Sequence, residues 1–221
     1  MRCVIFDLDG TLADTSGDLI AAANACFRSL GQGDLLDAGQ DQATALRGGR
    51  AMLKLGFERL GRSEASAEID AQYPRLLEYY GENIDRFTVL YPGVVAAVER
   101  LRASGHAVGI CTNKPEGLAE TLMTRLGVRD LFGSLIGADT LAVRKPDPAP
   151  LAEAVARAGG LLERTVMIGD TETDRDTARA AGVPCALVTF GPHGKAVSEL
   201  GADAVFDHYD ELDGVVAGLI G

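Results

Sequence analysis

Near its start the chain reads Cys3-Val4-Ile5-Phe6-Asp7-Leu8-Asp9-Gly10-Thr11, a short apolar run that ends in two acids and a glycine. Such a run predicts a buried strand that stops and exposes its tip. Residues two apart on an extended chain project to the same side, so strand geometry that persists to Asp9 would aim both carboxylates at one small volume. They repel each other there unless a cation or a proton intervenes. The pattern indicates a metal-assisted reaction on an anionic substrate, although it is also typical of a plain acidic turn.

Composition and charge narrow the class of protein. A chain of 221 residues suffices for one large domain or for a domain with a sizeable insertion, and its 47% hydrophobic and 24% charged content is typical of a soluble globular protein. The net charge of -11 argues against a nucleic-acid partner, because there is no basic excess to neutralise phosphates. We find no secretory leader and no apolar run long enough to span a bilayer, so no membrane partner is expected.

The cysteines bear on the cellular compartment. They are far apart in sequence, they form no C-x-x-C pair, and they occur at Cys3, Cys26, Cys111 and Cys185. Three of them lie in apolar, strand-like runs, which predicts buried free thiols. Free thiols suit a reducing compartment, and we therefore expect a cytoplasmic location.

Short apolar segments recur along the chain, and amphipathic helical patterns separate them. Strands without polar alternation are typical of a parallel sheet that is covered on both faces. Strands that alternate with helices predict an α/β doubly wound fold. The predicted strands are Cys3–Phe6, Ala107–Cys111, Ser134–Ile136, Val166–Ile168, Cys185–Val188 and Ala204–Phe206.

One long segment breaks this alternation. From about Gly17 to Asp85 there is no convincing strand, and three helices are predicted at 19–30, 52–60 and 69–80. The segment is too long for an ordinary crossover. We therefore predict a core of residues 1–16 and 86–221 and a helical insertion of residues 17–85, packed over the carboxyl ends of the strands. Ligands bind at those ends, so the insertion is expected to cover a ligand and exclude water; a structural appendage is the alternative.

Polar residues follow several predicted strands: Thr112 and Asn113, then Lys145 in a later loop, then Asp170 at a strand tip with Asp174 in the next helical turn. Taken one at a time, these residues are explained by helix capping, a solvated lysine and helix-dipole chemistry. Their occurrence at successive strand ends of one fold predicts a shared site for an anion instead.

Together these segments resemble a haloacid dehalogenase-superfamily hydrolase of the phosphoglycolate phosphatase-like group, with an α-helical cap. The resemblance covers essentially the whole chain, and its four motifs occur in order as Asp7-Leu8-Asp9-Gly10-Thr11, Thr112-Asn113, Lys145-Pro146 and Gly169-Asp170 with Asp174. It implies a Rossmann-like core, a phosphoric monoester hydrolase activity, Mg²⁺ dependence and an aspartyl-phosphate intermediate.

The resemblance also assigns roles to the acids. Asp7 would be the nucleophile, and Asp9 would protonate the leaving group and then activate water. Mg²⁺ would be held by Asp7, by the backbone carbonyl of Asp9 and by Asp170. Asp174 would lie behind them, near the metal waters or the site lysine. We expect the metal to keep Asp7 ionised and the remaining crowding to keep Asp9 protonated.

Phosphate binding is expected from backbone and side-chain donors together. Backbone N–H groups would come from Gly10, Thr11 and Asn113, and the Thr112 hydroxyl and Lys145 would complete the set. Lys114 is a rival to Lys145, but its motif position favours Lys145.

The sequence indicates the type of reaction more closely than it indicates the substrate. We expect a small phosphorylated metabolite, with 2-phosphoglycolate the first to test, and a protein that is a monomer or a homodimer. The alternatives are a β-phosphoglucomutase-like sugar phosphate mutase, a pyrophosphatase, a phosphonate hydrolase, or a non-catalytic phosphate-binding module of the same fold. In the insertion, Arg47-Gly48-Gly49-Arg50 is the candidate for leaving-group recognition, and a solvated helix start is the alternative.

Overall fold

The computed structural model describes residues 1–221, and the chain divides into two compact units. Unit 1 comprises Met1–Ala13 and Leu90–Gly221, and unit 2 comprises Asp14–Val89. The insertion predicted at residues 17–85 lies within unit 2, whose limits are slightly wider. None of the helices combines the length and apolar character that crossing a bilayer requires.

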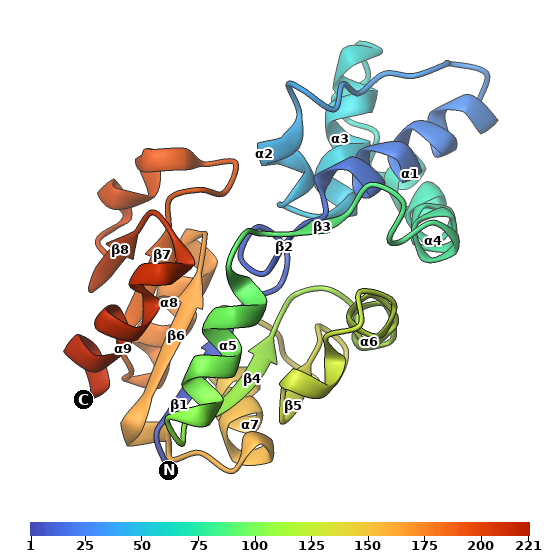
Figure 1. Ribbon diagram of the computed structural model, residues 1–221. Coiled ribbons are helices and arrows are strands. Elements are labelled where there is room, and N and C mark those ends of the chain that lie inside the picture. Colours follow the sequence, from blue (N-terminus) through green and yellow to red (C-terminus); the bar gives the residue numbers. More distant parts are fainter. The chain divides into compact units, whose positions relative to one another are not determined.

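Unit 1 is built on a six-stranded sheet in which every neighbouring pair of strands is parallel (Figure 1). The strand order is β5-β4-β1-β6-β7-β8, so β1 is central. This confirms the predicted α/β doubly wound fold, and each predicted strand is present with closely similar limits. The strands are β1 (Cys3–Phe6), β4 (Ala107–Cys111), β5 (Ser134–Ile136), β6 (Thr165–Gly169), β7 (Cys185–Val188) and β8 (Ala204–Phe206).

Helices cover both faces of this sheet, which is why the strands are mostly apolar. Helices α7 (Ala149–Ala158) and α8 (Glu172–Ala181) pack on one face, and α5 (Val94–Ala103) and α9 (Leu212–Ile220) pack on the other. Helix α6 (Glu116–Arg125) follows β4 and contacts β5. Short 3₁₀ helices complete the unit at Arg129–Leu131, Leu162–Arg164, Gly194–Leu200 and Tyr209–Glu211.

Unit 2 is helical, as the sequence predicts. Its helices are α1 (Ser16–Ser29), α2 (Gln42–Ala45), α3 (Gly49–Arg59) and α4 (Ser66–Glu82). The rings of Phe27 and Phe57 meet edge to face in its core, 5.3 Å apart. The buried Asp18 carboxylate accepts hydrogen bonds from the backbone N–H groups of Phe87 and Thr88, and so ties the first helix of the unit to its last segment.

Three short elements within or bordering unit 2 have no counterpart among the predictions. Helix α2 spans only one turn, which is too short to show a helical period. Strands β2 (Ala13–Asp14) and β3 (Val89–Leu90) have two residues each and form a two-stranded sheet where the chain passes between the units.

The register of the large sheet aligns the carboxyl ends of its central strands. Phe6 of β1 lies beside Ile110 of β4 and beside Ile168 of β6. The residues that follow these strands therefore meet at one edge of the sheet, where ligands bind in open α/β folds.

Candidate active site

The turn after β1 begins the site. The Asp7 N–H donates to the carbonyl of Ile168 at 2.8 Å, so Asp7 still belongs to the strand ladder. The chain then turns sharply, and Gly10 takes a φ of 82°, the left-handed region that favours glycine.

The backbone N–H groups of Gly10 and Thr11 take part in the turn itself. The Gly10 N–H donates to the Ala13 carbonyl at 2.9 Å and the Thr11 N–H to the Leu8 carbonyl at 3.3 Å. Both donors close the turn, whereas the sequence analysis expected Gly10 and Thr11 to offer them to phosphate. In this structure they shape the loop, and their use for phosphate binding stays a prediction.

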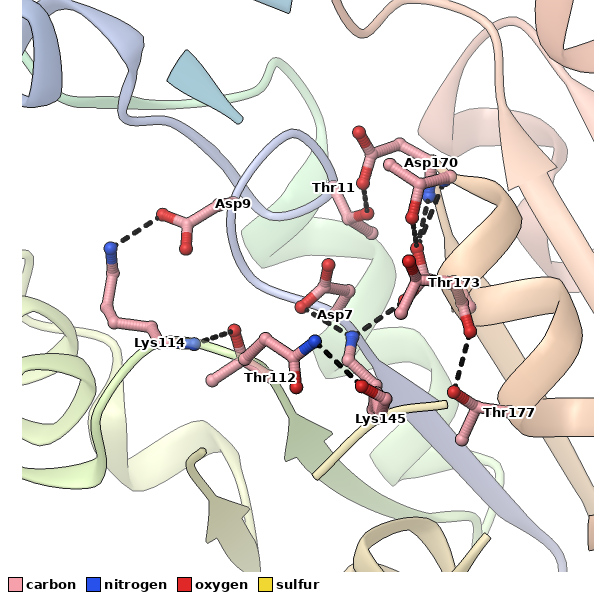
Figure 2. A network of polar contacts seen from close by, with 12 residues as sticks. Asp7, Asp9, Thr11, Thr112, Lys114, Lys145, Asp170, Thr173 and Thr177 are labelled. Atoms are coloured by element: carbon pink, nitrogen blue, oxygen red, sulfur yellow. Dashed lines mark hydrogen bonds and ion pairs between the residues drawn. The ribbon is translucent and has the colours of Figure 1, made fainter. Parts of the chain in front are cut away.

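Lys145 lies between two acids in the interior of the site (Figure 2). Its Nζ is 3.0 Å from Asp7 Oδ1 and 2.6 Å from Asp174 Oδ1. The three side chains are almost entirely buried, and a buried charge requires a partner of opposite sign. Burial disfavours the Lys145 ammonium, but Asp174 and Asp7 outweigh burial and raise its pKa, so Lys145 is a fixed positive charge beside Asp7.

Asp174 is an anchor for this lysine. It stands in the first turn of α8, where its Oδ2 accepts the N–H of Asp170 at 3.2 Å and both the N–H and the hydroxyl of Thr171 at 3.1 and 2.8 Å. A Cβ at Gly169 would lie only 2.3 Å from the Asp174 Cβ, so this close approach requires glycine. Since both oxygens of Asp174 already accept hydrogen bonds, its geometry suits holding Lys145 and the strand end.

Asp170 has a different environment from Asp174. Its Oδ1 accepts the Thr11 hydroxyl at 3.0 Å, while its Oδ2 is buried without a hydrogen-bond partner. The Thr11 carbonyl in turn accepts the buried Tyr209 hydroxyl at 2.8 Å. Tyr209 therefore steadies the loop whose threonine orients Asp170. Sequence reasoning missed it, because it lies 198 residues from Thr11 and in no motif.

The acids of the site carry an excess of negative charge. One oxygen from each of Asp7, Asp170 and Asp174 lies within 4.8 Å of the others, and these three carboxylates outnumber the nearby ammonium of Lys145 by two. Burial, followed by the charges of Asp174 and Asp7, raises the pKa of Asp170 well above its usual range. The unpartnered Asp170 oxygen and the surplus of two charges fit a divalent cation with oxygen ligands, such as Mg²⁺.

Burial is also the main cause that raises the pKa of Asp7, to about 6, with Lys145 opposing it. An acid whose pKa is higher in the folded than in the unfolded chain stabilises the fold at low pH, and that contribution is lost as pH rises through the folded value. For Asp7 the loss falls between about pH 4, the unfolded value, and about pH 6.

Asp7→Asn should therefore become more stable relative to the native chain as pH rises from 4 to 7 without metal. Urea unfolding at each pH, in the presence of a chelator, measures the difference in free energy of unfolding. The buried charge assigned to Asp7 is contradicted if that difference is the same at every pH or runs the other way.

Asp9 is held by the second lysine of the site. Lys114 Nζ lies 2.8 Å from Asp9 Oδ1, and the carboxylate of Asp9 is not part of the cluster around Asp7. The sequence analysis considered only the neighbouring acids of Asp9 and not the Lys114 ammonium. The two lysines that the sequence presented as rivals thus contact different acids, Lys145 at Asp7 and Lys114 at Asp9 (Figure 2).

The segment after β4 borders both lysines. Thr112 is buried, and its hydroxyl accepts the Lys114 N–H at 3.2 Å. The Asn113 side-chain amide donates to the carbonyl of Lys145 at 3.1 Å. Thr112 and Asn113 therefore lie beside the acid cluster, as the sequence predicts from their position at a strand end.

Comparisons with known proteins identify the family of the chain. The family model of the haloacid dehalogenase-like hydrolases matches residues 4–188. A phosphoglycolate phosphatase of Mesorhizobium japonicum is 39% identical over 95% of this chain and 92% of the relative, and one of Rhodospirillum rubrum is 38% identical over 96% and 89%. The crystal structure of a predicted phosphoglycolate phosphatase from Haemophilus somnus superposes with a TM-score of 0.82 at 23% identity, covering 97% of each chain.

The chain therefore belongs to the haloacid dehalogenase-like hydrolase family, and it is an enzyme of the hydrolase class. The resemblance identified from the four sequence motifs is confirmed.

Proposed function

We propose that the chain is a Mg²⁺-dependent phosphatase that hydrolyses a small phosphomonoester, with 2-phosphoglycolate the first substrate to test. One observation carries the proposal: a buried cluster of three carboxylates faces a single buried lysine, with one Asp170 oxygen left without a partner. Such a cluster suits a divalent cation and an anionic substrate together. The names of the full-length relatives support phosphoglycolate as the substrate.

The residues divide the chemistry between them. An Asp7 carboxylate oxygen attacks phosphorus and the ester P–O bond breaks, giving an aspartyl-phosphate, while Asp9 gives a proton to the leaving alkoxide. Asp9 then takes a proton from water as the water oxygen attacks phosphorus, which breaks the bond to Asp7 and releases phosphate. Asp7, the Asp9 carbonyl and Asp170 would hold Mg²⁺, which when bound neutralises the negative charge that surrounds the phosphoryl group.

We infer that Lys145 binds the phosphoryl group. Its Nζ lies 3.0 Å from Asp7 Oδ1, so a phosphoryl group on Asp7 falls within its reach. We infer that Thr112 and the Asn113 N–H complete the phosphate site from the neighbouring strand end. Charges and dipoles fixed in this way act on the equatorial oxygens in the transition state without reorganising.

The proposal also assigns a role to unit 2. We infer that it acts as the cap domain and supplies the groups that recognise the leaving group.

We further infer a cytoplasmic location, which the four buried free cysteines support. The oligomeric state stays a prediction of monomer or homodimer.

Phosphate release from a substrate panel tests this function. The panel contains 2-phosphoglycolate, sugar phosphates, nucleotides and pyrophosphate, each measured with Mg²⁺ and with a chelator. We expect turnover that the chelator abolishes and a preference for 2-phosphoglycolate. Preference for a sugar phosphate, with its isomer as product, would support the mutase instead. Preference for pyrophosphate would support a pyrophosphatase, and no turnover of any compound would support a non-catalytic module.

A further inference from the structure

Lys114 is a buried lysine for which the proposed chemistry has no task. Its side chain is only 4% exposed and its Nζ lies 2.8 Å from Asp9 Oδ1, with the Asp9 side chain 16% exposed. Taking an ammonium out of water is unfavourable, and a close partner of opposite charge offsets much of that cost. The position is thus built to keep this cation beside Asp9.

The backbone of Lys114 is fixed independently of Asp9. Its N–H donates to the Thr112 hydroxyl at 3.2 Å, and its carbonyl accepts the Ala138 N–H at 2.9 Å. Thr112 itself continues the ladder, since its N–H donates to the Ile136 carbonyl at 2.9 Å. Lys114 therefore reaches from a rigid strand end, whereas Asp9 stands on the turn that follows β1.

The two lysines of the site contact different acids, which distinguishes Lys114 from the lysine expected to bind phosphate. Lys145 already contacts Asp7, and Lys114 contacts Asp9 (Figure 2). A lysine paired with the acid beside the nucleophile acts on the orientation of that acid. A proton-transfer group must lie within hydrogen-bond reach of the atom it serves, so its orientation sets the rate of the transfer.

We propose that Lys114 is a positioning residue for Asp9, holding its carboxyl group in the orientation that proton transfer to the leaving group requires. This rests on the proposed function, because that function assigns the transfer to Asp9. Lys114 then affects the reaction through Asp9 and not through the phosphoryl group.

The dependence of the rate on the leaving group distinguishes these two roles. An alkoxide leaves poorly without a proton, whereas a nitrophenolate leaves without help. Lys114→Met keeps a long unbranched side chain and removes the charge. We expect kcat/KM to fall at least about 10-fold for an alkyl phosphate such as 2-phosphoglycolate and less than about threefold for p-nitrophenyl phosphate. The exposed Lys195→Met is the matched control and should leave both rates unchanged.

A double variant sharpens the test. In an Asp9→Asn background the proton donor is absent, so adding Lys114→Met should cost nothing further on either substrate. Lys114→Arg keeps a cation beside Asp9 and should recover part of the alkyl phosphate rate. If Lys114→Met fails to fold, Lys114→Gln replaces it and the same ratio of rates decides.

An equal loss on both substrates, or a further loss in the Asp9→Asn background, would overturn this role and assign Lys114 to the phosphoryl group. Asp7→Asn separates this outcome from failure of the proposed function. If Asp7→Asn is inactive while Lys114→Met slows both substrates equally, only the role of Lys114 fails. If Asp7→Asn retains activity, the proposed function fails as well.

Discussion

Asp7→Asn is expected to lower the rate of phosphate release on the order of 10⁴-fold or more, because an amide cannot replace the carboxylate nucleophile. The loss should appear on every substrate, whatever its leaving group. It should also be a loss of chemistry and not of folding, since the buried carboxylate of Asp7 is itself unfavourable at neutral pH without metal.

Phosphate release and thermal unfolding of the same preparation measure the two effects. Asp213→Asn is the matched control, because Asp213 is a partly exposed acid paired with Arg100 in the same unit. The control should keep native activity. An Asp7→Asn protein with native activity would remove Asp7 from the mechanism.

Lys145→Met is expected to reduce both stability and activity. Without the ammonium, Asp7, Asp170 and Asp174 are left as buried carboxylates with no cation. Breaking a buried ion pair by removing one partner costs about 3–5 kcal/mol. The cost should be largest at pH 7 and smaller at pH 5, because the raised pKa values of Asp7 and Asp170 allow them to protonate at acidic pH.

Urea unfolding without metal, at both pH values, measures this cost. Adding Asp174→Asn to Lys145→Met removes one of the unpaired charges and should recover part of the stability but none of the activity. Lys195→Met again serves as the exposed control. A Lys145→Met protein that is as stable as the native chain at pH 7 would contradict the account of Lys145 as the cation of the cluster.

Much of the fold follows from the sequence, for identifiable reasons. Strands such as Cys3–Phe6 and Cys185–Val188 are apolar without alternation because both faces are covered, and that pattern is legible in a single chain. Helix α2 and the two-residue strands lack a readable period. Their existence depends on contacts that the sequence does not display.

The candidate site also has features that the sequence predicts and features that it does not. Asp7 and Asp170 directly follow strand ends, and parallel strands bring their ends together, so the convergence of these two acids could be predicted. Lys145 in its loop and Asp174 in the first turn of α8 are expected there from their motifs. Which lysine meets which acid depends on side-chain directions, and spacing carries no information about them. The hydrogen bonds of the Gly10 and Thr11 N–H groups depend on the local geometry of the turn, and the hydrogen bond from Tyr209 depends on tertiary packing; spacing shows neither.

The central claim is that the phosphoryl group passes through Asp7 on its way to water. The stereochemistry at phosphorus tests it most directly. A phosphorothioate ester made chiral with oxygen isotopes is hydrolysed in isotopic water, and the configuration of the released thiophosphate is determined. Two successive in-line displacements, first on Asp7 and then by water, predict net retention of configuration. Net inversion would show a single displacement by water and would contradict the aspartyl-phosphate mechanism.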